Sequence, residues 1–258
     1  MKGRRGNIQA IKFFDELGIK HPNDLPIEDI AYSQGAFIEN NDLEGCEGRI
    51  VFDNDEAIVT IDKKINYEPK RRFIIAHELG HFRMHKNLNP CFIDNEHTLN
   101  EWYATGIHEL EANCFSAELL MPEVIIRPLF KGRKFNLDII YEVSEEFKTS
   151  ITATLLRYRE LGDYPMALIL VKNGFVEWSQ FTTDFPLTFI PKGSKVSPWT
   201  VAGDFFHNGN ELEENPEKVA AIEWFPEDFN LNKFKNWEFY EQCFRASKES
   251  VLACLWTF

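Results

Sequence analysis

The chain has 258 residues, of which 44% are hydrophobic, so it can form one large domain or two modest ones around a proper core. Its formal net charge of −13 argues against a nucleic-acid-binding surface as the main function, because phosphate contacts require clustered Lys and Arg side chains. Five scattered cysteines without C-x-x-C spacing, no apolar leader and no run of about twenty apolar residues predict a cytoplasmic protein with reduced thiols and no membrane segment.

The first part of the chain is expected to mix helices and strands. Apolar residues at helical spacing predict a helix over 8–17, which Gly18 would end, and a second short helix over 27–33. Two β-rich runs, 48–52 and 57–61, are separated by four polar residues and predict a hairpin. An exposed edge on the strand before the next helix could align an extended peptide as an added strand.

The segment 71–85 contains His77-Glu78-x-x-His81 and is expected to form a buried helix. Residues four apart lie on the same helix face, about 6 Å apart, so His77 and His81 can bind one metal ion at roughly 2.0–2.1 Å per Zn–N bond. Glu78 would lie beside this face and take the proton of a metal-activated water, as amide hydrolysis requires. The alternative is two core histidines with ordinary hydrogen bonds.

Other polar residues near this motif have more open roles. His85 continues the four-residue spacing but lies about 12 Å along the helix axis from His77, so we expect it to be structural or to line the cleft. The segment 87–106 is expected to form an active-site loop. An oxyanion needs a hydrogen-bond donor aimed at it, and three candidates for that role stay open: His97, Tyr103 and His108.

A third metal ligand is expected on a second helix, predicted over 108–121 and ended by the following proline. Glu109 borders the apolar arc of this helix and is therefore the expected ligand, with Glu111 as the alternative. Glu111 and Glu118 are expected on the opposite, solvent-facing side. Asn113, one turn after Glu109, is a candidate for a hydrogen bond that holds a ligand in place.

The segment 137–161 predicts two short helices, the second capped by Ser150. Two such helices superficially resemble a helix-turn-helix. The second helix offers Arg157 and Arg159 but also Glu160, and the chain is acidic overall. We therefore expect a packing or substrate platform rather than a DNA-binding element.

The remainder of the chain predicts a small β-rich core. The runs 166–171 and 175–181 flank an Asn-Gly turn and predict a hairpin, and further strands are expected over 218–225 and 251–258. No candidate catalytic group is found in this half. Five tryptophans are expected to anchor its core: Trp178, Trp199, Trp224, Trp237 and Trp256.

Two stretches together resemble a known family. Arg-Phe-Ile-Ile-Ala-His-Glu-Leu-Gly-His at 72–81 and Glu-x-x-Ala-Asn-x-Phe-x-Ala-x-Leu-Leu-Met-Pro at 109–122 resemble the ImmA/IrrE-type metallopeptidases, and the similarity covers a little over half of the chain. The resemblance implies a cytoplasmic bacterial or phage protein, and several members cleave or antagonise DNA-binding repressors. It implies the following roles: zinc ligands His77, His81 and Glu109, and general base Glu78. Unlike some members, this sequence shows no repressor-like DNA-binding domain at its N-terminus.

These observations predict an α+β protein with a zincin-like metallopeptidase domain over 1–162, including a helical hairpin at about 137–161, and a C-terminal β-rich α+β domain over 163–258. The predicted function is a zinc-dependent endopeptidase acting on a protein substrate such as a repressor-type regulator, with neither membrane nor nucleic acid as a partner. The alternative is a non-catalytic protein that keeps the zinc fold and antagonises a repressor or toxin by contact.

Overall fold

The computed structural model describes residues 4–88, 91–94 and 106–257, and it confirms the predicted α+β class. The chain forms two compact units: unit 1 comprises Met1–Ile126 and Val143–Ser150, and unit 2 comprises Arg127–Glu142 and Ile151–Phe258. Across the described residues, no helix has both the length and the apolar character that crossing a bilayer requires. The division into domains over 1–162 and 163–258 stays a prediction.

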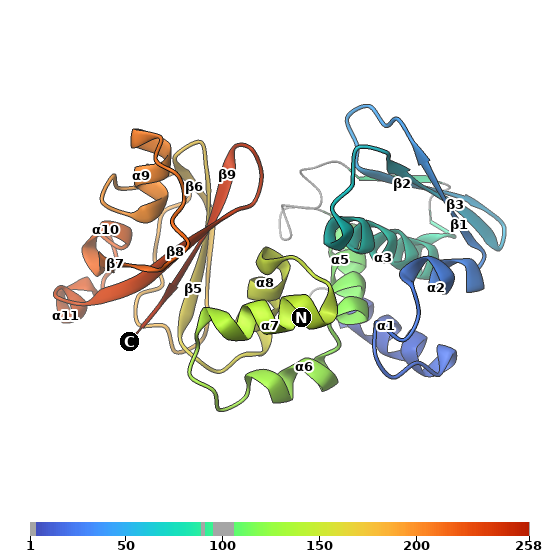
Figure 1. Ribbon diagram of the computed structural model, residues 1–258, viewed down its shortest axis with the longest axis horizontal. Coiled ribbons are helices and arrows are strands. Elements are labelled where there is room, and N and C mark those ends of the chain that lie inside the picture. Colours follow the sequence, from blue (N-terminus) through green and yellow to red (C-terminus); the bar gives the residue numbers. More distant parts are fainter. Residues whose placement is uncertain (1–3, 89–90, 95–105, 258) are drawn as a thin grey trace. The chain divides into compact units, whose positions relative to one another are not determined.

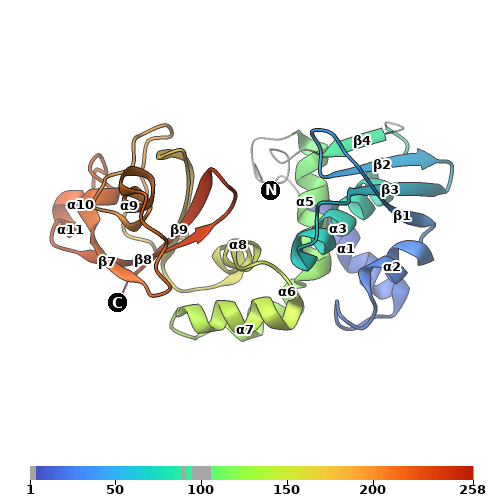
Figure 2. The ribbon, with the colours of Figure 1, turned by 45° about the horizontal axis from the view of Figure 1, so that its top comes forward.

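Unit 1 contains a four-stranded sheet with the strand order β1-β3-β2-β4 (Figure 2). The predicted hairpin is confirmed, since β2 and β3 pair antiparallel across a turn in which Asn54 adopts a left-handed φ of 56°. The predicted peptide-binding edge is wrong, because β3 pairs on its other side with an unpredicted parallel strand, β1. Among the strands that the structure describes, β1 and β4 therefore form the edges of the sheet. The strands are β1 (Ala36–Asn41), β2 (Gly48–Asp53), β3 (Glu56–Asp62) and β4 (Cys91–Asp94).

Helix α3 is the central element of unit 1, with the sheet on one side and α5 on another (Figures 1 and 2). Twelve of its 18 residues are buried, which confirms the predicted buried helix. Helix α1 packs against α5 and closes the core, and Gly18 ends α1 as predicted, with a φ of 67°. The helices are α1 (Arg4–Leu17), α2 (Ile27–Ser33), α3 (Glu68–His85) and α5 (Ile107–Leu120).

Helices α3 and α5 approach closely because the residues at their crossing are small. A Cβ atom added to Gly80 on α3 would lie 3.2 Å from the Cα of Ala112 and 3.1 Å from the Cδ1 of Phe115, both on α5. The small residues Gly80 and Ala112 therefore permit this close approach. The Phe115 ring also contacts Phe13 of α1 edge-on, at 5.7 Å between centroids, so the three helices share one core.

Three further helices follow α5. The predicted pair over 137–161 is confirmed, whereas the helix before it, which contains Pro128, was not predicted. These helices are α6 (Glu123–Phe130), α7 (Leu137–Phe147) and α8 (Ile151–Leu161). In unit 2, the ring of Tyr158 on α8 packs against Phe130 and Phe135 at centroid distances of 4.6 and 4.9 Å, so the residues before α7 belong to the core of that unit.

Unit 2 contains a five-stranded antiparallel sheet with the order β6-β5-β9-β8-β7. The predicted hairpin is confirmed, and its turn residues Asn173 and Gly174 both have positive φ. The expected strand over 218–225 is wrong beyond Ala220, where a short helix begins, and β8 was not predicted. The strands are β5 (Met166–Lys172), β6 (Phe175–Phe181), β7 (Glu217–Ala220), β8 (Glu238–Arg245) and β9 (Ser250–Trp256).

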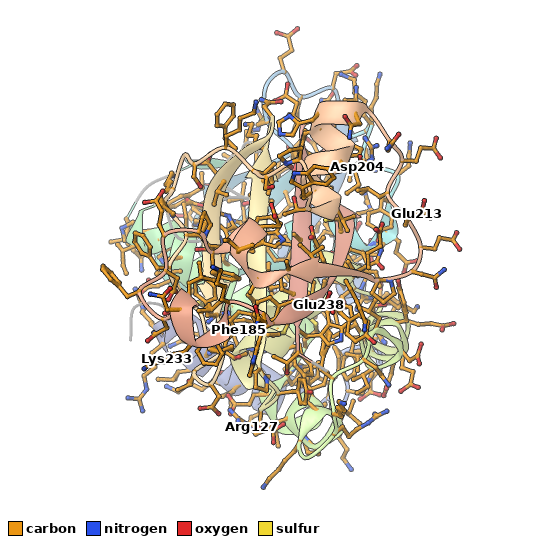
Figure 3. The ribbon with its side chains drawn as sticks, turned by 90° about the vertical axis from the view of Figure 1, so that its left-hand side faces the viewer. Arg127, Phe185, Asp204, Glu213, Lys233 and Glu238 are labelled. Carbon is orange, nitrogen blue, oxygen red and sulfur yellow. The ribbon has the colours of Figure 1, made fainter. Side chains whose placement is uncertain are left out.

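Both faces of this sheet are covered. Helices α9 (Val201–Asn208), α10 (Ala221–Trp224) and α11 (Leu231–Phe234) lie over one face, and α8 lies on the other (Figure 1). Figure 3 looks onto the side with α9 and α11, which carry the labelled Asp204 and Lys233. Two tryptophans are core residues as predicted, Trp224 and Trp256, whereas Trp199 and Trp237 are 78% and 45% exposed, so their predicted anchoring role is wrong.

A buried carboxylate ties α9 to the sheet. Glu241 on β8 is completely buried and accepts hydrogen bonds from the backbone N–H groups of Val201 (3.1 Å) and Ala202 (3.0 Å), in the first turn of α9. It also accepts one from the Trp224 indole at 2.9 Å. Burial raises the pKa of Glu241 above its ordinary value, and these donors oppose that effect. All three donors depend on this one side chain.

We expect Glu241→Ala to destabilise unit 2 by about 3 kcal/mol, because three buried donors lose their acceptor at roughly 1–3 kcal/mol each. Denaturant unfolding followed by tryptophan fluorescence would measure the loss. Glu217 faces Glu241 in the β7–β8 register but is exposed, so Glu217→Ala is the matched control, with an expected change below about 0.5 kcal/mol. Equal stability of the two variants would contradict the anchoring role.

Candidate metal centre

Three predicted ligand residues converge in unit 1. His77 and His81 lie one turn apart on α3, and Glu109 lies in the first turn of α5. The Nε2 atoms of the two histidines are 3.0 Å apart, and the Glu109 Oε2 lies 3.2 Å from that of His77 and 3.3 Å from that of His81. Both imidazoles are completely buried, and the Glu109 side chain is 17% exposed. The site is therefore open on the side of the carboxylate.

The three donor atoms fit a tetrahedral metal ion. Bonds of about 2.0–2.2 Å, as for zinc, place neighbouring ligand atoms about 3.3–3.5 Å apart, close to the three separations found here. The Nε2 atoms of the two imidazoles and one carboxylate oxygen point at one spot, and in the tautomer with its proton on Nδ1 each ring offers a lone pair there. A divalent cation would accept all three lone pairs, so the donor set fits such an ion.

The surroundings of Glu109 favour the ionised form of its carboxylate, as an anionic metal ligand requires. Burial alone would raise its pKa, but the hydrogen bonds from His77 and His81 outweigh this effect and bring the pKa well below its ordinary value. The carboxylate is consequently ionised at neutral pH. A negative charge held against two neutral imidazoles lowers the cost of placing a divalent cation among them.

Glu78 lies under the first strand of the hairpin. Its side chain is completely buried, and a Cβ atom added to Gly48 on β2 would lie 2.9 Å from Glu78 Oε1 and 2.6 Å from Ile74 Cγ2. The β2 backbone can therefore pass this close to the carboxylate only with glycine at that position. Sequence reasoning assigned no role to Gly48, because nothing in the local pattern indicates which side chain lies beneath it.

An aromatic side chain from β4 covers the ligands. The ring of Phe92 stacks on the imidazole of His81 at 4.2 Å between centroids and lies 5.7 Å from that of His85. This contact limits rotation of the His81 ring about its χ2 angle. It also places an edge strand of the sheet directly beside the site, because β4 pairs with β2 at the end of the described sheet.

A second polar group lies behind the first. His85 is completely buried, with its Nδ1 atom 3.1 Å from His81 Nδ1 and its Nε2 atom 3.0 Å from Glu111 Oε2. Burial lowers the pKa of His85 to about 4, so its imidazole is neutral. Glu111 and Glu118 were expected to face solvent, and this expectation is wrong, since they are 8% and 3% exposed. Glu111 is buried because it pairs with both His85 and Arg5.

The remaining candidates are less well placed. Asn113 is completely buried, yet within the described residues its side-chain amide has no hydrogen-bond partner, so the expected bond to a ligand is not found. His108 packs edge-on against His85 at 4.7 Å between ring centroids. His97 and Tyr103 lie outside the described residues. The role of an oxyanion donor therefore stays a prediction for all three.

Comparison with known proteins agrees with this centre. The profile of the IrrE N-terminal-like domain (Peptidase_M78) matches residues 40–159, which include both α3 and α5. The chain is 31% identical over 121 residues to "Uncharacterized immunity region protein 2" of Bacillus phage phi105, covering 47% of this chain and 73% of that protein. It is 28% identical over 127 residues to "Metallopeptidase ImmA" of Bacillus subtilis (strain 168), covering 45% and 70%.

A solved structure shares the fold over nearly the whole chain. It is described as "Mycobacterium tuberculosis transcriptional regulator" and superimposes with a TM-score of 0.63, at 13% sequence identity. The match covers 98% of this chain and 76% of that chain. At this identity, the likeness shows a common fold that extends beyond the peptidase-like residues into unit 2.

We expect His77→Ala to weaken divalent metal binding by more than about 100-fold. Removing a residue that only hydrogen-bonds to a ligand lowers metal affinity by about 10–100-fold, and removing the ligand itself should lower it further. Isothermal titration with Zn²⁺ would measure the affinity. His207→Ala is a matched control: its ring contacts only the Val196 carbonyl among the described contacts and lies in unit 2. An unchanged affinity in the His77 variant would remove that residue from the metal centre.

Proposed function

We propose, from the premise that this chain belongs to the ImmA/IrrE family of metallopeptidases, that it is a zinc-dependent endopeptidase that hydrolyses a protein substrate. One observation carries the proposal: the donor atoms of His77, His81 and Glu109 lie within 3.3 Å of one another, with Glu78 next in sequence to the first of them. A protein that only needed rigid packing would gain nothing from three converging lone pairs.

In the proposed mechanism, His77, His81 and Glu109 would hold a zinc ion. When bound, zinc polarises the scissile carbonyl and lowers the pKa of the attacking water. Glu78 accepts a proton from that water on its carboxylate and later donates it to the amine nitrogen of the leaving peptide. Gly48 sets the position of this carboxylate, since the β2 backbone lies directly against Glu78 Oε1. Proton transfer needs such fixed geometry.

The substrate would lie along β4. An extended peptide can bind to a sheet edge by forming main-chain hydrogen bonds as an added strand. The edge at β4 is next to the site, because Phe92 of that strand stacks on His81. A peptide on this edge would pass close to the metal ligands. The interior strand β3 is paired on both sides and has no edge for a peptide to join.

A DNA-binding repressor is the substrate class that we propose. One relative is titled an immunity region protein and another a metallopeptidase, and the substrate class follows from the family, several members of which cleave or antagonise DNA-binding repressors. The net charge of −13 would speed encounters with a basic partner by electrostatic steering. Incubation of a purified repressor with the protein, with and without a chelator, tests the proposal. Cleavage that the chelator stops supports it, whereas release of an intact repressor would favour antagonism by contact alone.

We expect Glu78→Gln to lower the turnover of a cleaved substrate by about 10²–10⁴-fold, because the amide cannot accept the proton of the water. Zinc content should stay at the wild-type level, since Glu78 is not a ligand in this scheme. Glu56→Gln, an exposed acid on β3, serves as the control and should keep full activity. Turnover retained in the Glu78 variant would exclude Glu78 as the general base.

We expect Gly48→Ala to lower kcat on the order of 10²-fold, because the added carbon would displace the Glu78 carboxylate. Metal binding should change little, so a loss of activity together with loss of zinc would count against this explanation. Gly106→Ala offers the matched control, because no atom of the described residues lies within 4 Å of a carbon added there and its φ is −59°. Steady-state kinetics and zinc analysis of both variants would test it.

A further inference from the structure

We infer that His85 is a positioning residue that links Glu111 to the metal ligand His81 and thereby fixes the tautomer and the ring orientation of that ligand. The inference rests on the proposed metal-binding role of His81 and deepens it. His85 touches neither the substrate nor the donor atoms of the centre in this scheme. It acts only through the opposite nitrogen of His81.

The contacts form one continuous chain across three helices. His81 on α3 presents Nε2 to the centre and Nδ1 to His85 Nδ1, at 3.1 Å. The other nitrogen of His85 lies 3.0 Å from Glu111 Oε2 on α5. Arg5 on α1 then binds the same oxygen of Glu111 through Nη1 at 3.2 Å, and its Nη2 donates to the Met84 carbonyl at 3.1 Å.

The protons on this chain can be assigned in order. A metal-bound Nε2 carries no proton, so the neutral ring of His81 must carry its proton on Nδ1. That N–H points at His85 Nδ1, which must accept it, so the proton of the His85 ring lies on Nε2. The Nε2–H group donates to Oε2 of Glu111, which also accepts a hydrogen bond from Arg5. Each assignment follows from the one before it, and no donor faces another donor.

The surroundings of His81, His85 and Glu111 hold these hydrogen bonds in one arrangement. His81 and His85 are completely buried, and the Glu111 side chain is 11% exposed. Phe92 covers both imidazoles, so water has little access to compete for their hydrogen bonds. An outer carboxylate or carbonyl commonly orients a metal-bound histidine directly, whereas here a second imidazole is interposed.

A second metal ion is the alternative, because donor atoms of His85, His108 and Glu111 also lie within 4.8 Å of one another. Such an ion would take the lone pair of His85 Nε2 and move the proton of that ring to Nδ1. Two N–H groups, one on His81 and one on His85, would then face each other at 3.1 Å. The ion would also lie beside the Arg5 guanidinium. Both consequences are unfavourable, so the geometry points to the hydrogen-bonded chain.

The test measures metal binding and needs no substrate. We expect His85→Phe, which keeps a ring but no nitrogen, to weaken Zn²⁺ affinity by about 10–100-fold while the stoichiometry stays at one. The visible spectrum of the Co²⁺-substituted variant should differ from that of the wild type, because the His81 ring is no longer held. His85→Asn restores an acceptor near the Nδ1 position and should recover part of the affinity. His108 takes no part in this chain of hydrogen bonds, so the His108→Phe variant should bind Zn²⁺ as tightly as the wild type does.

Three results would each overturn the inference about His85. Two zinc ions per wild-type chain, with one lost in both the His85→Phe and His108→Phe variants, would overturn the inference in favour of a second site. One ion bound equally tightly in wild type and His85→Phe, with identical Co²⁺ spectra, would overturn it while the proposed peptidase stands. A wild-type protein that binds no zinc would overturn both proposals.

A second pair of variants covers the case in which His85→Phe does not fold. Glu111→Gln keeps an oxygen acceptor for His85, whereas Glu111→Met has a similar volume and no comparable acceptor. We expect the Met variant to bind Zn²⁺ about tenfold more weakly than the Gln variant. Circular dichroism would verify that both variants are folded. Equal zinc affinities in the two folded variants would contradict the proposed chain of hydrogen bonds.

Discussion

The close contact between Gly80 on α3 and Ala112 on α5 is the constraint on which the metal centre depends. His77 precedes Gly80 by three residues, and Glu109 precedes Ala112 by three, so each ligand lies about one helical turn from the crossing. Metal–ligand distances tolerate deviations of only about 0.2 Å. A larger side chain at the crossing would separate the helices by more than that, and the donor atoms would no longer converge.

Buried carboxylates occur in both units, and their partners distinguish a reactive site from a structural anchor. Glu241 has only donors around it, two backbone N–H groups, an indole and the Cys243 thiol, so its lone pairs are satisfied by the protein itself. Glu109 instead lies beside two imidazole nitrogens that can donate an N–H group or, in the other tautomer, offer a lone pair. Fixed donors around a carboxylate make a stable anchor, whereas groups that can all offer lone pairs to one point can hold a cation.

Much of the centre was predictable because it depends on local spacing. The four-residue separation of His77 and His81 determines their common face on any helix, and the apolar arc of the next helix pointed to Glu109. The burial of Glu111 was not predictable, because a helical wheel treats the side opposite the core as solvent. Here α1 covers that side of α5 and supplies Arg5. Which element packs on a second face is a tertiary property that one helix does not encode.

The errors in the strands have a similar origin. The parallel strand β1 is rich in polar residues and joins β3 only through long-range pairing, so neither the strand nor the interior position of β3 could be read locally. The chain also passes between the two units after Ile126, Glu142 and Ser150. Phe147 is buried in unit 1, where it lies 5.0 Å from His21, and Phe135 packs on Tyr158 in unit 2. No single cleavage of the polypeptide would therefore yield both halves intact, and truncation at any one point leaves part of a core behind.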